Sequence, residues 1–148
     1  SYLLGLTCMA RGSAFMTTRV VTISPEASVL DASLLMSEKN IGSVVVVEGD
    51  IPVGIVTERD IIAGVVSKRL PPEKTLVKEV MSKPLVACPP ECNIDEAASL
   101  MQAHKIKHLP VVKGQELVGI FTTYDLMVAR SHEYDRIQAT IAELMKEK

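Results

Sequence analysis

A seven-residue pattern occurs twice in this chain and constrains the fold more than any other feature. Gly54 to Asp60 and Gly119 to Asp125 both have the form Gly, two apolar residues, Thr, two variable residues, Asp. The two copies lie 65 residues apart, and this separation holds without a gap back to Met16 and Met81. Identical residues recur along the register: Val21 with Val86, Pro25 with Pro90, Glu26 with Glu91, Ala32 with Ala97, Leu35 with Leu100, Met36 with Met101, Ile41 with Ile106, and Gly49 with Gly114. Such a register indicates a duplicated structural unit.

The size and charge of the chain limit what the two units can be. A chain of 148 residues has room for one ordinary domain or for two small units that share a core. Its 47% hydrophobic and 23% charged residues are typical of a soluble globular protein. Because the net charge is −2 and only 3% of residues are aromatic, neither a basic field nor stacking platforms for nucleic acid are expected.

The apolar segments and the cysteines bear on location. No apolar run approaches the ~18–20 residues that a membrane span needs, so no membrane partner is expected. The short run Tyr2 to Leu6 is preceded by no basic residue, which makes it a weak signal-peptide candidate. Cys8, Cys88 and Cys92 form no disulfide framework and suit a reducing compartment. We therefore expect a cytoplasmic protein.

The first unit is predicted to be β-α-β-β-α. Residues 20–23 and 53–56 are short strand-forming runs, and the apolar run 43–47 indicates a strand buried on both faces. Ser28 is a predicted helix N-cap with Asp31 in capping-box position, followed by Val29, Ala32, Leu35 and Met36 at helical spacing and ended by Asn40. A second helix, from about residue 58 to 68, is expected to bury Ile61, Ile62, Val65 and Val66.

The second unit repeats this order after a break at residues 70–74. Strands are predicted at 85–87, 108–112 and 117–121, a helix begins at Asn93, and a last helix begins near Thr123. That helix carries an apolar stripe of Tyr134, Ile137, Ile141, Leu144 and Met145, which we expect to pack on the module or on a second chain. The expected divisions are an arm (1–15), a first repeat (16–70), a linker (71–80), a second repeat (81–130) and an amphipathic helix (131–148). The predicted class is α/β with mixed sheets and pseudo-twofold symmetry.

The repeated Thr-x-x-Asp has a structural and a functional interpretation. Structurally, each motif fits a helix capping box after a strand, worth ~1 kcal/mol per cap. Functionally, a strand-to-helix turn exposes backbone N–H groups that attract phosphate, while a carboxylate and a hydroxyl one turn apart can hold a vicinal diol such as a ribose. Ile55 and Ile120, which precede the Thr residues, could then lie against a flat base.

The two units resemble a tandem pair of CBS domains, the regulatory repeat named after cystathionine β-synthase. The resemblance rests on Gly54 to Asp60, on Gly119 to Asp125 and on Leu109-Pro110-Val111-Val112, and it covers about residues 16–130. In the first unit Val44-Val45-Val46 stands in place of the family's Leu-Pro-Val. The resemblance implies a disc with two clefts that bind adenosine compounds (AMP, ADP, ATP or S-adenosylmethionine) as regulatory ligands, with no permanent cofactor.

The resemblance also implies two sets of site residues. In the first cleft the ribose would lie on Thr57 and Asp60 beside Ile55, and the remaining contacts would come from Arg59, Leu85, Val86, Ile106, Lys107, His108 and Pro110. The second cleft would use Thr122, Asp125 and Ile120 with Val20, Val21, Ile41 and Gly42, and with Arg19 and Arg11 near the phosphates. Because Tyr124 stands where the first motif has Arg59, the clefts should bind unequally, and Arg59 favours a phosphate in the first.

Other groups of residues offer alternatives to this site. His104 and His108 have a zinc-ligand spacing only if one helix holds both, but the helix is expected to end before His108; Cys88 and Cys92 flank a turn. No nucleophile-base pair recurs in both units, so no catalysis is expected. We expect a homodimer through helices, with Ile61, Ile62, Val65 and Val66 as one surface, acting on an effector protein that the sequence does not name. The alternative is a purely structural interaction module whose Thr-x-x-Asp pairs only cap helices.

Overall fold

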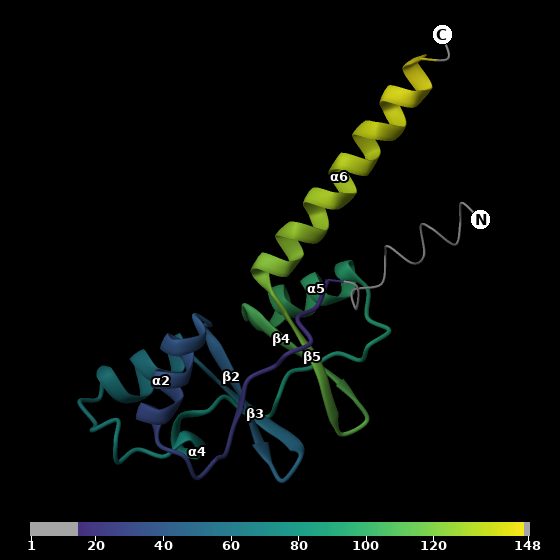
Figure 1. The fold of residues 1–148 in the computed structure, drawn as a ribbon. Helices are drawn as coiled ribbons and strands as arrows, with labels where there is room; N and C mark the ends of the chain where they lie inside the picture. Colours follow the sequence, from purple (N-terminus) through teal and green to yellow (C-terminus); the bar gives the residue numbers. More distant parts are fainter. Residues whose placement is uncertain (1–14, 147–148) are drawn as a thin grey trace.

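The first half of the protein contains a three-stranded sheet with helices beside it. The structure is a computed structural model and describes residues 15–146. The elements of this half, drawn in purple to teal in Figure 1, are β1 (Thr22–Ile23), α2 (Val29–Lys39), β2 (Ser43–Glu48), β3 (Ile51–Thr57) and α3 (Glu58–Ile61), which continues as the π-helical segment η2 (Ile62–Val66). The β-α-β-β-α order is therefore confirmed for this half. A short helix that the sequence did not predict, α4 (Val77–Val80), lies in the expected linker and buries Val77 in the core of this half.

The second half repeats the arrangement with one strand fewer. It contains α5 (Ile94–His104), β4 (His108–Lys113), β5 (Glu116–Thr122) and α6 (Thr123–Lys146). The strand predicted at residues 85–87 is wrong, because pairing there is reduced to a parallel bridge between Cys88 and Val111. Pro84, Pro89 and Pro90 have no N–H to donate, and this limits the ladder that the segment can form.

The two hairpins are duplicated down to their irregularities. The strand β1 pairs in parallel with β2, while the β2–β3 and β4–β5 pairs are antiparallel. The register shifts between Val46 and Val47 in one hairpin and between Val111 and Val112 in the other, at matching positions of the repeat. Gly49 and Gly114 both have φ of +64° in the turns, which is a conformation that other residues rarely adopt.

Helix ends follow the predicted capping chemistry. The side chains of Ser28 and Asn93 accept the backbone N–H groups of Asp31 and Glu96 at 3.0 and 2.8 Å. The left-handed residue Asn40 (φ 53°) closes α2 as expected. The second helix of the first half departs from expectation: only Val65 is buried, Ile61 is half-buried, and Ile62 and Val66 are exposed.

Each half is completed by the segment that precedes the other half. Thr17 exchanges backbone hydrogen bonds with Ile120 of β5, and Ser82 exchanges them with Ile55 of β3. The preceding residues, Met16 and Met81, pack so closely that a Cβ placed on Gly119 or Gly54 would lie 2.5 or 2.8 Å from their sulfur atoms. The chain therefore crosses between the halves twice.

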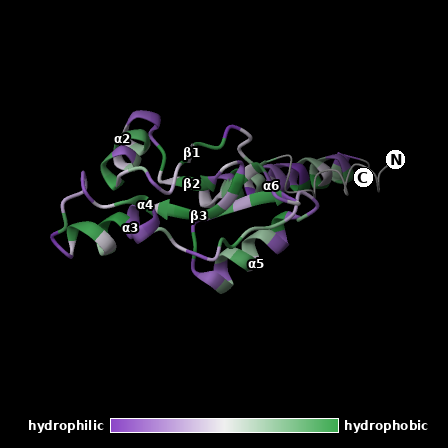
Figure 2. Cartoon of the chain, turned by 90° about the horizontal axis from the view of Figure 1, so that it is seen from below, coloured by the Kyte–Doolittle hydropathy of each residue, from purple (hydrophilic) through white to green (hydrophobic). Residues whose placement is uncertain are grey.

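A third apolar cluster joins the halves. Each half has its own core, and a separate cluster of Val45, Ile55 and Ile120 is flanked by partly buried Val20, Val47, Leu85 and Leu117 from both halves. Figure 2 shows the apolar strands running through the middle of the molecule with helices on both sides. The helix α6 continues well beyond this body (Figure 1). None of the described helices is both long and apolar enough to cross a membrane.

Candidate functional site

The first Thr-x-x-Asp motif forms a complete capping box at the end of β3. Asp60 Oδ2 accepts the Thr57 backbone N–H at 2.9 Å and the Thr57 hydroxyl at 3.1 Å, and Thr57 Oγ1 accepts the Asp60 N–H at 3.2 Å. The other carboxylate oxygen, Asp60 Oδ1, accepts the Ser82 hydroxyl at 2.8 Å. Both oxygens of this carboxylate are thus engaged.

The second motif has the same box but a less occupied carboxylate. Asp125 Oδ2 accepts the Thr122 N–H at 2.9 Å, and Thr122 Oγ1 accepts the Asp125 N–H at 3.2 Å. Thr17 holds the place that Ser82 holds in the first half, yet no side-chain bond joins Thr17 to Asp125 among the described residues. Asp125 is half-buried, so its second oxygen remains able to accept a hydrogen bond. Ser82 is a site residue that sequence reasoning missed, although a hydroxyl residue at both positions of the repeat was the available signal.

His108 connects the two halves beside the first motif. Its backbone pairs with Thr122, while its ring lies against Gly42 of the first half: a Cβ on Gly42 would be 3.3 Å from Nε2 and 2.8 Å from Glu58 Oε1. Its Nδ1 is buried and has no hydrogen-bond partner in the described part of the chain. Burial lowers the pKa of His108, Glu58 opposes this shift, and Lys107 adds to it. Burial between the halves therefore disfavours the charged form of the ring.

Apolar residues of the predicted site divide into two groups. Ile55, Ile120, Val20 and Leu85 lie together in the cluster between the halves, with Ile55 and Ile120 only 9% and 7% exposed. Val21 and Ile41 instead pack against the core of the first half, Val86 and Ile106 pack against that of the second, and Pro110 is fully buried. The structure therefore brings the first group to the interface between halves and directs the second group into the separate cores.

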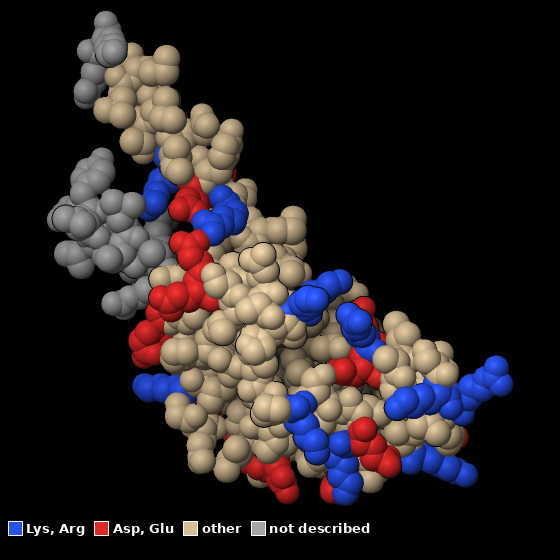
Figure 3. Space-filling model, turned by 180° about the vertical axis from the view of Figure 1, so that it is seen from behind, with Lys and Arg blue, Asp and Glu red and all other residues tan. Residues whose placement is uncertain are grey.

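Basic residues of the predicted site lie on the surface. Arg19, Arg59 and Lys107 are exposed, and the Lys107 carbonyl accepts the Thr123 N–H at 3.2 Å. Figure 3 shows acidic and basic side chains interspersed over one face, without a broad field of either sign. Arg11 lies outside the described residues.

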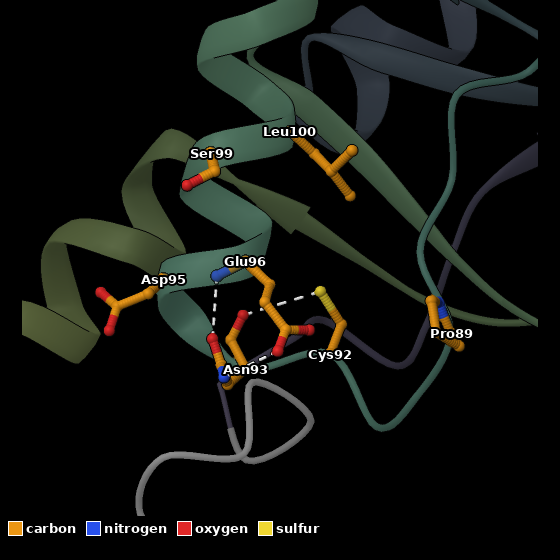
Figure 4. A pocket seen from close by; sticks show the side chains of 7 residues that line it. All are labelled: Pro89, Cys92, Asn93, Asp95, Glu96, Ser99 and Leu100. Carbon is orange, nitrogen blue, oxygen red and sulfur yellow. Dashed lines mark hydrogen bonds between the residues drawn. The ribbon is translucent and has the colours of Figure 1, made fainter.

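Two surface hollows lie away from both motifs. One is lined by Thr22 to Glu26 and Val47 to Gly49, and the other lies at the start of α5. The residues around the second hollow are Pro89, Cys92, Asn93, Asp95, Glu96, Ser99 and Leu100, shown in Figure 4.

The cysteines beside that hollow are packed rather than reactive. Cys88 and Cys92 are buried and reduced. Burial, helped by hydrogen bonding to Cys92, raises the pKa of the Cys88 thiol to about 12, and burial also raises the pKa of Cys92. Within residues 15–146 no three His, Cys, Asp or Glu side chains are placed to hold a metal ion, and His104 ends α5 while His108 begins β4.

This chain is similar in sequence to two proteins of other organisms. The CBS domain-containing protein YhcV of Bacillus subtilis is 39% identical over 113 residues, which is 76% of this chain and 80% of YhcV. An inosine-5'-monophosphate dehydrogenase of Korarchaeum cryptofilum is 37% identical over 125 residues, which is 84% of this chain but only 25% of that protein.

Solved structures share the fold. An uncharacterized conserved protein from Pyrococcus horikoshii is 34% identical with a TM-score of 0.77, covering 82% of this chain and 92% of that one. A hexameric CBS-CP12 protein from bloom-forming cyanobacteria is 37% identical with a TM-score of 0.72, covering 78% and 68%. The family model for the CBS domain matches twice, at residues 12–67 and 77–132. The chain belongs to the CBS domain family and contains two CBS domains in tandem.

Proposed function

We propose that this CBS pair is a regulatory module, without catalysis of its own, that binds an adenosine nucleotide between its halves. The ribose hydroxyls would be held at the two Thr-x-x-Asp motifs, with the base against the apolar residues beside them. Arg59 within the first motif and His108 beside it would be available for phosphate oxygens, and Lys107, whose carbonyl accepts the Thr123 N–H, would serve at the second motif. Binding would tie the halves together and shift the conformation that an effector protein meets.

The observation that carries this proposal is the free acceptor at the second motif. Asp125 uses Oδ2 for its cap, and Oδ1 has no partner among the described residues. A carboxylate oxygen beside the N-terminus of a long helix is a good acceptor for a sugar hydroxyl, and the backbone N–H groups there favour an anion. At the first motif the ligand must displace the Ser82 hydroxyl from Asp60 Oδ1, so we expect the second site to fill first.

The expected affinity suits a sensor. At ~0.3 kcal/mol per heavy atom, an AMP-sized ligand reaches roughly −7 kcal/mol, which corresponds to a dissociation constant of micromolar order or weaker. A ligand at 100 times its dissociation constant stabilises the folded state by about 2.7 kcal/mol, and this shift is measurable as a rise in Tm.

Calorimetry with AMP, ADP, ATP and S-adenosylmethionine tests the proposal, using GMP as the matched control for the base. The informative variants are Asp60→Asn and Asp125→Asn, because Asn keeps one acceptor oxygen for the cap while losing the charge that holds the diol. Asp125→Asn should weaken the tighter site at least tenfold with little change in Tm, and Asp60→Asn should affect the weaker one. Absence of heat and of any Tm rise at millimolar concentrations of all four compounds would exclude the proposal.

The second candidate function is a purely structural interaction module, and the capping boxes at both motifs favour it. In that case Asp60→Ala and Asp125→Ala should lower stability by ~1 kcal/mol each through loss of the cap. The wild type itself should then show no nucleotide-dependent rise in Tm. Both carboxylates cap their helices whichever function holds, so the Ala variants lose stability in either case. The discriminating result is a nucleotide-dependent rise in Tm that the wild type shows and the Ala variants lack, which supports the sensor instead.

A further inference from the structure

An apolar stripe runs along the part of α6 that extends beyond the body. Ala129 is the only buried residue of α6, Arg130 bonds Asp95 at the start of α5 and Glu133, and His132 contacts Phe15. Beyond His132 the helix extends past the other helices and strands of the described chain (Figure 1). A helix of this length is marginal in water unless an apolar face is packed.

Every exposed large apolar residue of α6 lies on one seam. Written as a heptad, Met127, Tyr134 and Ile141 occupy position a, Ile137 and Leu144 position d, and Tyr124 and Met145 position e. These seven residues, called here the α6 stripe, keep 44% to 71% of their surface exposed. From Tyr134 to Leu144 the spacing is 3-4-3, the repeat with which two helices pack along a shared seam. The stripe therefore fits another helix of the same period.

We propose that two copies of this chain associate through the α6 stripe as a two-helix coiled coil. The surface available matches a small but specific interface. A large apolar side chain carries roughly 100 Å² of apolar surface, so the seven partly exposed side chains of two copies would bury on the order of 800 Å². The neighbouring helix atoms bring the total near the ~1,000 Å² that a biological interface needs.

The charges beside the stripe permit self-association. Its flanking positions hold the neutral residues Ser131, Gln138 and Thr140 together with Glu133. Arg130 occupies the position d between Met127 and Tyr134, and it is paired with Asp95 and with Glu133, the latter at 2.9 Å. Two copies therefore meet without an unpaired like charge. On the face shown in Figure 3, the distal part of α6 presents no charged side chain.

The start of the described chain lies on the other side of the helix. Phe15 contacts His132, with ring centroids 5.9 Å apart, and His132 is at position f, opposite a and d. The described body therefore leaves the stripe uncovered, and a second copy offers an identical stripe of equal length. The α3–η2 surface predicted from sequence is a smaller candidate, because Val65 is buried and only Ile62 and Val66 are exposed.

Sedimentation velocity of the full chain over a concentration series tests this proposal without any nucleotide. The wild type should sediment as a dimer at about 100 μM, and Ile141→Asp should raise the dissociation constant about 100-fold or more, because it places a charge in the seam. Ala139→Asp adds the same charge at position f and should leave the dimer intact. Since Ile141 lies outside the three core clusters, the thermal transition of the body should survive in both variants, which separates lost association from lost folding.

Three results would overturn the proposal: a monomeric wild type at this concentration, an assembly that Ile141→Asp leaves unchanged, or equal loss in Ala139→Asp. None of these depends on nucleotide binding. Failure of the dimer and failure of the sensor are thus separate outcomes.

Discussion

At the scale of single residues, His108 is the clearest source of a pH response. Burial lowers its pKa below the ordinary 6.5, so between the lowered value and about 6.5 the unfolded chain binds more protons than the folded one. The free energy of unfolding therefore falls as pH drops below about 6.5 and is fully retained above it. In His108→Gln this part of the dependence should disappear.

Urea unfolding at pH 7.5 and at pH 5 checks this prediction. The difference in unfolding free energy between the two pH values should be smaller in His108→Gln than in the wild type. His104→Gln, which alters an exposed imidazole at the end of α5, serves as the control and should keep the wild-type difference. Equal differences in all three proteins would show that His108 does not carry the response.

Sequence reasoning foresaw residue types at this scale better than residue surroundings. The repeat located Thr57, Asp60 and their copies because capping depends on residues three apart in sequence. Ser82 and Asp60 are 22 residues apart in the sequence, and His108 and Gly42 are 66 residues apart. Such contacts depend on how the halves pack, which local patterns do not encode.

At the scale of elements, the two caps offer a matched comparison. Thr57→Val keeps the side-chain shape but removes the hydroxyl that accepts the Asp60 N–H and donates to its carboxylate, so it should cost ~1 kcal/mol of stability. In the described structure the Thr122 hydroxyl only accepts a hydrogen bond, from the Asp125 N–H. Thr122→Val should therefore lower the unfolding free energy by no more than Thr57→Val does. Thr57→Ser and Thr122→Ser retain the hydroxyl and should be close to wild type in urea unfolding. A Ser variant as unstable as its Val counterpart would contradict the capping role.

Elements with strong local signals were foreseen, and those set by tertiary context were not. Both ends of α2 and the starts of α5 and α6 follow from capping residues and apolar spacing in the sequence itself. The strand expected at residues 85–87 does not form, and pairing is limited to the bridge at Cys88. Apolar residues predicted it, but the neighbouring prolines have no N–H to donate to a ladder. The expected burial of Ile62 and Val66 failed because the segment becomes π-helical at Ile62, and a wider helical turn changes the face that each side chain occupies.

At the scale of the whole molecule, the two crossings of the chain make the halves depend on one another. Thr17 completes the second half before β1 joins the first, and Ser82 completes the first half before Cys88 joins the second. Neither half can unfold without releasing a segment from the other. The apolar cluster of Val45, Ile55 and Ile120 adds a shared core between them. We therefore expect one cooperative unfolding transition for residues 15–130.

Ile120→Ala tests this coupling because Ile120 is 7% exposed and lies where the halves meet. Truncating a buried Ile to Ala costs about 2–5 kcal/mol. If the halves unfold together, native-state hydrogen exchange should show the slowest amides of β2–β3 losing as much protection as those of β4–β5. Loss confined to β4–β5 would show that the halves unfold separately.

A nucleotide bound between independently unfolding halves would stabilise mainly the half that holds its ribose, whereas in a coupled pair it stabilises both. The same exchange measurement with and without AMP therefore connects the fold to the proposed sensing.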